Sequence, residues 1–160
     1  MLSMRIIFVL TTLTVLFTLP YSLAGQSQEP WFGTWRLNLA KSTTDRDARF
    51  KRATSKIEPW EDGLKVTYDL VGMRGGLTHM EWIGKLDGKD YPVQGVDYVF
   101  TNAYSRVNDR TYQIAIKVDG VATATARVVI SPDGKTLTTL TTGKDAQGNT
   151  VKTTTVYDRQ

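Results

Sequence analysis

Hydrophobic and polar residues alternate along most of the chain after Trp31. Between positions 64 and 70, the even-numbered residues are apolar or aromatic and the odd-numbered residues are polar. The segment 111–118 repeats this pattern, with its large apolar residues at even positions. A period of two is typical of a strand with one buried and one solvated face.

Turn-forming residues separate the alternating segments at short intervals. Asp-Gly pairs at 62–63, 87–88, 119–120 and 133–134 supply the positive φ angle that tight hairpins need. No segment after the N-terminal apolar stretch shows a helical stripe longer than two turns. The pattern predicts ten strands, at 34–39, 54–60, 63–71, 77–86, 89–93, 98–106, 111–118, 121–130, 135–142 and 150–157.

Ten short strands that all connect by hairpins predict an all-β protein. A long open meander would leave two edges exposed to pairing with other chains, and closure removes both edges. We therefore expect a single antiparallel up-and-down β-barrel of about 8–10 strands, in preference to an open sandwich.

The segment 40–55 interrupts the alternation, because it is polar and rich in basic residues. Thr44 is suited to cap a short helix over 45–52, with Asp45 and Asp47 in its first turn. Two interpretations remain open for this segment. It is either a lid or anion-attracting rim, or a solvated connection between the first two strands.

The first 24 residues have the composition of a secretory signal peptide. Arg5 precedes an apolar run from Ile6 to Leu19, Pro20 ends that run, and small residues at 22 and 24 suit a cleavage site. The run is shorter than the roughly 20 residues that a membrane span needs. We therefore expect residues 1–24 to be removed, residues 25–160 to form the barrel domain, and the protein to be exported, periplasmic or secreted, without an integral membrane span.

Charge and composition exclude several kinds of function. Without Arg5 the net charge falls from +4 to +3, and basic and acidic residues are interspersed, so nucleic-acid binding is not expected. The chain has no cysteine and one histidine, which excludes disulfides and multi-histidine metal sites. His79 and Glu81 share the polar face of a strand and are interpreted as a surface pair, since no nucleophile motif accompanies them. We expect no enzyme activity, no metal and no cofactor.

The interior of the predicted barrel is either a ligand cavity or a packed core. Ala122, Ala124 and Ala126 share one face of a strand and leave space unless large groups opposite fill it. The two C-terminal strands are rich in threonine, and inward hydroxyl groups need partners or water. Arg106 and Arg127 are candidates to hold a ligand head group. The candidate interior residues are Trp35, Tyr68, Met80, Trp82, Phe100, Tyr104, Tyr112, Ala124 and Ala126.

The segment Gly33-Thr34-Trp35 resembles the opening of lipocalins and fatty-acid-binding proteins, the calycin group. The longer run 33–42, together with 87–93, 131–137 and 156–158, is similar to a group of small exported bacterial lipocalin-like proteins of unsettled function. The resemblance implies that Gly33 and Trp35 begin the first strand and close one end of the barrel. It also implies that a basic residue near the last strand packs over Trp35, with Arg159 as the best match and Arg127 as the second.

Two functional hypotheses follow. In the first, an exported lipocalin-like protein binds a small, largely hydrophobic ligand in the barrel interior. In the second, the barrel is packed solid and serves as a non-catalytic envelope interaction or structural domain, with Trp31, Trp60 and the basic segment 41–56 facing a partner. The sequence carries no signal for an oligomeric state.

Overall fold

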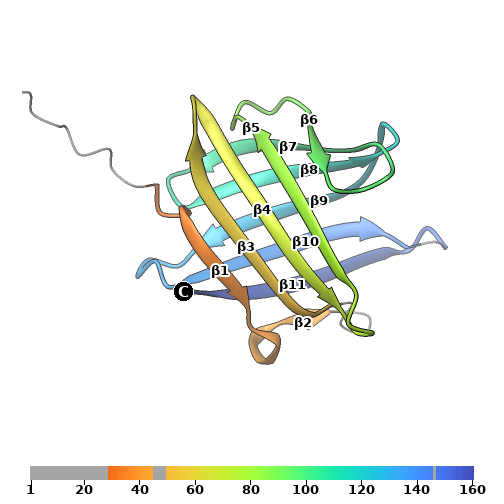
Figure 1. The fold of residues 1–160 in the computed structure, drawn as a ribbon, viewed down its shortest axis with the longest axis horizontal. Helices are drawn as coiled ribbons and strands as arrows, with labels where there is room; N and C mark the ends of the chain where they lie inside the picture. Colours follow the sequence, from red (N-terminus) through yellow and green to blue (C-terminus); the bar gives the residue numbers. More distant parts are fainter. Residues whose placement is uncertain (1–28, 45–49, 146) are drawn as a thin grey trace, which may run out of the picture.

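The computed structural model describes residues 29–44, 50–145 and 147–160, and its strands form one antiparallel sheet that closes on itself (Figure 1). A short 3-10 helix, η1 (Leu39–Lys41), follows the first strand. The strands are β1 (Gly33–Leu37), β2 (Thr43–Thr44), β3 (Phe50–Trp60), β4 (Gly63–Gly72), β5 (Leu77–Gly84), β6 (Tyr91–Gln94), β7 (Phe100–Asn108), β8 (Thr111–Val118), β9 (Val121–Ile130), β10 (Thr136–Lys144) and β11 (Thr150–Arg159).

The strand order confirms the predicted up-and-down barrel. From β3 to β11 each strand pairs with the next one along the chain, β1 pairs with β3, and β1 also pairs with β11. The closing register places Trp35 opposite Arg159 and Leu37 opposite Tyr157. Ten strands of the described chain make this ring, and β2 extends the line of β1 along β11. Closure leaves the main strands without a free edge.

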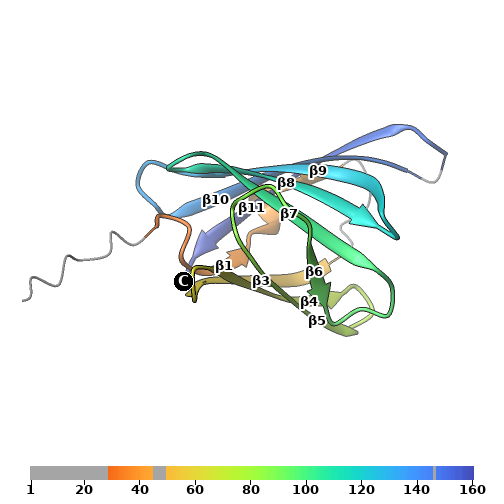
Figure 2. The same cartoon turned by 90° about the horizontal axis from the view of Figure 1, so that it is seen from above.

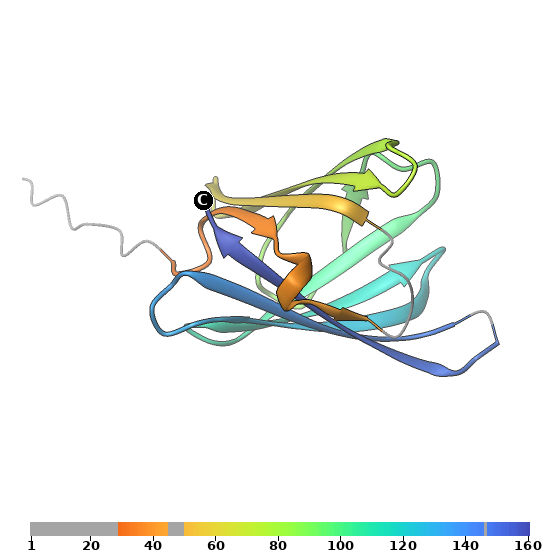
Figure 3. The ribbon, with the colours of Figure 1, turned by 90° about the horizontal axis from the view of Figure 1, so that it is seen from below.

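The segment 40–55 contains less helix than the sequence suggested. The helix considered for 45–52 is not formed in its last three residues, because β3 already begins at Phe50. Positions 45–49 and the proposed signal peptide lie outside the described residues. The 3-10 helix η1 lies against β11 (Figure 3). Just before this helix, the backbone N–H of Asn38 donates to the Val156 carbonyl at 2.8 Å.

The two ends of the barrel differ in what they carry. We call the end that holds the N-terminal residues 29–32, the β9–β10 turn and the C-terminus the closed end, because Trp31 and Trp35 are fully buried there. The opposite, open end carries the β4–β5, β8–β9 and β10–β11 turns. Figures 1 and 2 show the N-terminal stretch and the C-terminus together, with the β10–β11 hairpin projecting away from them.

Candidate functional site

The closed end is sealed by two tryptophans and one arginine. The Trp35 indole N–H donates to the Trp31 carbonyl at 2.8 Å, and the Arg159 Cζ atom lies 4.2 Å from the centre of the Trp35 ring. Arg159 also donates to the carbonyls of Phe32 and Gly134, each at 2.6 Å. The guanidinium therefore combines a cation–π contact with hydrogen bonds that join the N-terminal stretch to the β9–β10 turn.

Gly33 makes room for this guanidinium. Its φ of +140° lies in a region that L side chains rarely adopt, and a Cβ atom at this position would lie 2.7 Å from Arg159 Nη1. The glycine and the tryptophan of the Gly33-Thr34-Trp35 segment thus serve one contact, since Gly33 admits the arginine that covers Trp35.

Aromatic rings fill the barrel next to this seal. The ring centres of Trp82 and Tyr104 are 4.0 Å apart, and those of Tyr104 and Tyr112 are 5.5 Å apart. Tyr112 in turn meets the Trp31 ring edge-on at 5.7 Å. Trp82 and Tyr104 have at most 1% of their surface exposed, so this half of the interior is densely packed.

The other half of the interior contains a cavity of about 200 Å³. Its lining comes from inward-facing positions of the nine strands β3 to β11, mostly apolar with a few hydroxyl and amide groups. Such a lining is typical of small-molecule sites. The lining residues are Ser55, Tyr68, Met80, Val93, Phe100, Asn102, Tyr112, Ile114, Ile116, Ala126, Val128, Leu137, Thr139, Thr141 and Tyr157.

Tyrosine hydroxyl groups supply part of the polarity of the interior. The hydroxyl oxygens of Tyr68 and Tyr104 lie 2.5 Å apart and share a hydrogen bond. Burial raises the pKa of Tyr68 to about 12 and raises the pKa values of Tyr104, Tyr112 and Tyr157 as well. These phenols therefore stay protonated and uncharged at neutral pH.

Asn102 has the least satisfied polar group of the lining. Its side chain belongs to the inward face of β7 and the residue is only 5% exposed. Its Oδ1 atom has no hydrogen-bond partner among the described residues. No lining residue carries a charged side chain, so the cavity offers an unused acceptor in uncharged surroundings.

The structure brings five of the nine predicted interior residues to the cavity. Three others, Trp35, Trp82 and Tyr104, belong to the packed half instead. Ala124 lies on the inner side of β9 opposite Gly143 and is not part of the lining. The five that line the cavity are Tyr68, Met80, Phe100, Tyr112 and Ala126.

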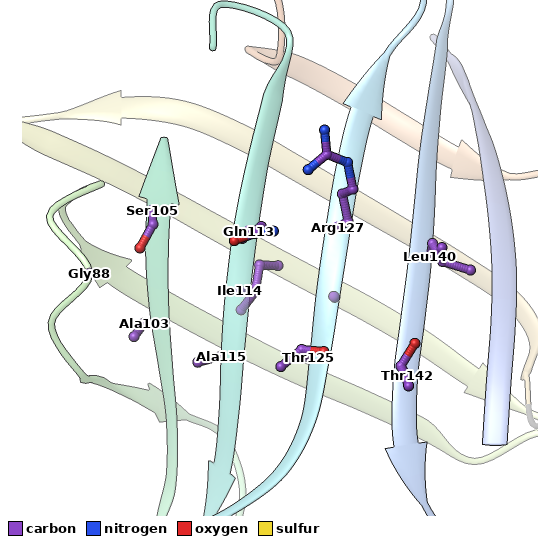
Figure 4. Close-up of a pocket in the computed structure, with 11 residues that line it drawn as sticks. Gly88, Ala103, Ser105, Gln113, Ile114, Ala115, Thr125, Arg127, Leu140 and Thr142 are labelled. Atoms are coloured by element: carbon purple, nitrogen blue, oxygen red, sulfur yellow. The ribbon is translucent and has the colours of Figure 1, made fainter. Parts of the chain in front are cut away.

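Neither candidate head-group arginine reaches the cavity. The Arg106 Cζ atom lies 4.8 Å from the centre of the Trp31 ring, and its guanidinium pairs with Glu29 at the closed end. Arg127 lies on the outer face of β9 beside a shallow groove of about 300 Å³ that crosses β7 to β10 (Figure 4). Figure 4 shows Arg127 and Leu140 beside the short side chains of Ala115 and Thr125.

The lining residues that were not among the candidates fall into two groups, one with a signal in the sequence and one without. Most follow the period-two pattern, as Ile114 and Ile116 do between Tyr112 and Val118 on the inner face of β8. Ser55 and Asn102 give no such signal, because polar residues at inward positions interrupt the apolar pattern. The remaining missed residues are Val93, Val128, Leu137, Thr139, Thr141 and Tyr157.

Several exposed apolar side chains lie at the open end. They come from the β4–β5 turn, the segment before β7 and the start of β9, and their exposed fractions range from 48% to 68%. The Asp119 amide donates to the Val99 carbonyl at 2.8 Å, which ties two of these segments together. We call this set the apolar rim, and its members are Met73, Leu77, Tyr98, Val99 and Val121.

The only histidine of the chain lies outside the barrel. His79 Nδ1 is 2.7 Å from Asp69 Oδ1, and Glu81 pairs with Lys65 at 2.5 Å on the same outer face. Among the described residues, no group of three or more histidine or acidic side chains is placed to hold a metal ion. No helix in the described ranges is long and apolar enough to cross a membrane.

Comparison with known proteins relates the chain to barrels of the same architecture. No protein-family model matches the sequence, and no curated protein matches it. Zebrafish ileal bile acid-binding protein, complexed with cholic acid, has a TM-score of 0.51 at 13% identity over 82% of this chain and 99% of that chain. The siderocalin Ex-FABP has a TM-score of 0.42 at 14% identity, covering 82% of this chain and 71% of its own. The likeness to the first structure shows a shared fold, a closed antiparallel up-and-down β-barrel.

Proposed function

We propose that this chain is an exported lipocalin-like protein that binds a small, largely hydrophobic ligand inside its barrel. The interior cavity carries the proposal, because its walls are mostly apolar and its few polar groups converge on one space. The zebrafish protein of similar fold is complexed with cholic acid, which supports a binding role rather than catalysis. We propose no enzyme activity.

The size of the cavity limits the ligand. Typical sites for drug-sized ligands measure about 300–1,000 Å³, and an apolar cavity of about 150 Å³ accepts benzene. A cavity of about 200 Å³ therefore suits one or two fused rings or a short branched chain. A longer ligand would leave part of its length outside this space.

The apolar rim supports entry from the open end. Phe100 lines the cavity and its ring centre lies 6.0 Å from that of the rim residue Tyr98, so apolar surface continues from the rim toward the interior. Single exposed apolar residues are common on proteins, and it is the contact of Tyr98 with Phe100 that connects the rim to the cavity.

Titration with naphthalene tests the proposal. With methyl-labelled protein, we expect NMR shifts at Ile116, Val128 and Leu137, which line the cavity and not the outer groove, and none at Ala115 on the outer face. Ala126→Leu adds three carbons inside the cavity and should weaken binding at least about tenfold. Thr125→Leu, the neighbouring outward position, is the matched control. The proposal fails if naphthalene leaves the interior methyl signals unchanged.

The alternative is a non-catalytic interaction or structural domain. The outer groove favours it, because its volume of about 300 Å³ is larger than that of the interior cavity, about 200 Å³. One part of that hypothesis was wrong, because Trp31 is fully buried and cannot face a partner. Trp60 is 41% exposed, with Lys65 Nζ 5.0 Å from its ring centre. Recovery of a stoichiometric partner that Arg127→Glu abolishes, with no ligand in the barrel, would favour this alternative.

Export is tested separately. Expression of the full chain in a bacterial host, followed by fractionation and mass spectrometry, should give a mature chain of residues 25–160 outside the cytoplasm. Recovery of the intact 160-residue chain from the cytoplasm alone would contradict export and leave the proposed binding site unaffected.

A further inference from the structure

We propose that the ligand is an uncharged molecule whose hydroxyl or N–H group donates a hydrogen bond to Asn102 Oδ1. The inference rests on the proposed function and deepens it, because it names the chemistry of the ligand. It starts from Asn102 Oδ1, a buried acceptor without a hydrogen-bond partner among the described residues, on a residue that lines the cavity.

A buried amide oxygen without a partner is unfavourable. Burial removes its bonds to water, and buried polar side chains in proteins nearly always have a partner. Asn102 is 95% buried and is one of the residues that line the cavity, whereas its Oδ1 atom has almost no accessible surface of its own. A donor placed in the cavity therefore meets Oδ1 once the side-chain amide turns toward that space. Either a water molecule or a ligand can supply the donor. A ligand that replaces this water gains the most binding free energy when it brings a donor of its own.

Asn102 is held firmly in place. In β7 it pairs with Tyr91 of β6 on one side and with Ile116 of β8 on the other. Its backbone carbonyl oxygen also accepts a hydrogen bond from the Trp82 indole N–H at 3.1 Å. These contacts fix the backbone of Asn102 from three directions, so only its side-chain torsions have to be ordered when a ligand binds.

The charge of the surroundings excludes an anionic ligand. The cavity wall carries no charged side chain, and a carboxylate buried there would be unpaired. Arg106 is engaged with Glu29 and the Trp31 ring, and Arg127 lies on the opposite side of the sheet. The tyrosine hydroxyls stay neutral, and those of Tyr68 and Tyr104 bind each other.

A matched series of probes tests the inference on the unmodified protein. Naphthalene has no polar group, 2-methoxynaphthalene can only accept, 2-naphthol can donate, and 2-naphthoate is anionic. We expect 2-naphthol to bind roughly five- to tenfold more tightly than 2-methoxynaphthalene, as a neutral hydrogen bond predicts. We expect 2-naphthoate to bind most weakly of the four. Calorimetry at neutral pH measures all four affinities.

The variant Asn102→Leu assigns the preference to this residue. Leucine has a similar size and cannot accept a hydrogen bond, so the affinity ratio of 2-naphthol to 2-methoxynaphthalene should fall to about one. Naphthalene binding should be unchanged or tighter. Thr139→Val, which removes a different polar group from the wall, is the control and should keep the ratio.

The outcomes separate the inference from the proposed function. Failure of all four probes to bind would overturn both. Equal binding of 2-naphthol and 2-methoxynaphthalene, which is expected if water alone serves Asn102, would overturn only the inference. Tighter binding of 2-naphthoate than of the uncharged probes would also overturn only the inference. Because the probe series uses the native chain, the test stands even if Asn102→Leu does not fold.

Discussion

The two halves of the barrel interior use similar side chains in opposite ways. At the closed end, aromatic rings and the Arg159 guanidinium fill the space, and Trp35 and Trp82 are fully buried. In the other half, a cavity of about 200 Å³ remains between Tyr68, Tyr112 and smaller side chains. One continuous sheet surrounds both halves, so the difference lies in side-chain size and not in backbone architecture.

Polar groups show the same contrast. Around Trp35, the indole N–H and the Arg159 guanidinium all bond to backbone carbonyls within the chain. Trp31 Nε1 is the exception, as it has no partner in the described residues. In the cavity half, Asn102 lines the cavity and its Oδ1 atom has no partner among the described residues. The closed end thus stabilises the fold, whereas the cavity half keeps unused volume and an unused acceptor.

Trp35→Ala should have the largest effect on stability. It removes the buried ring between Arg159 and Trp31 and leaves a void, which costs about 3–5 kcal/mol of unfolding free energy. Urea denaturation measures this loss. Trp60→Ala, at a partly exposed position, should cost under about 1 kcal/mol, and equal losses in the two variants would refute a special role for the closed end.

Arg159→Met should rank second, at about 2 kcal/mol. The methionine keeps an apolar contact with Trp35 but leaves the carbonyls of Phe32 and Gly134 without their donor. Arg127→Met on the outer face is the control, with an expected change within about 0.5 kcal/mol. If the two variants unfold at the same urea concentration, the seal does not depend on Arg159.

Gly33→Ala should cost about 1–2 kcal/mol. The new Cβ would be strained at a φ of +140° and would displace the Arg159 guanidinium. Gly76→Ala, where a Cβ would meet nothing within 4 Å, gives the comparison. In the Arg159→Met background, the cost of Gly33→Ala should shrink, and an unchanged cost would show that the clash is not its cause.

Tyr68→Phe should have the smallest effect, about 1 kcal/mol, because it removes the hydrogen bond to Tyr104. It also has a pH signature. The folded chain holds the Tyr68 proton up to a pKa of about 12, whereas the unfolded chain loses it near 10. Stability should therefore fall as pH rises between these values, and Tyr68→Phe should make the fall shallower. Tyr98→Phe, at an exposed position, should leave the slope unchanged.

Much of the fold could be predicted from the chain. Alternation and turn residues placed ten strands close to their observed positions, because a period of two and positive-φ turns are local properties. The helix considered for 45–52 was wrong at 50–52, where pairing with β4 extends β3 despite polar side chains. At these positions the pairing with β4 outweighs the intrinsic conformational preference of the residues.

The candidate site was only partly predictable for a related reason. Alternation indicates which residues point inward, and it correctly assigned Tyr68 and Ala126 to the inner face. It does not indicate how far along the barrel axis each residue lies. Trp82 and Tyr112 both point inward, yet Trp82 packs away from the cavity and Tyr112 lines it. Asn102 was missed because a buried polar residue breaks the apolar pattern.

The sequence by itself determined the strand pattern, the hairpin order and the Gly33-Thr34-Trp35 opening, since each depends on near neighbours in the chain. Only the tertiary structure decided which inward side chains meet. It stacked Trp82, Tyr104 and Tyr112 into a filled half, left a cavity beside them, and placed Arg106 and Arg127 outside it. Those contacts join residues distant in sequence, and their energies depend on strand register and barrel closure, which no local pattern records.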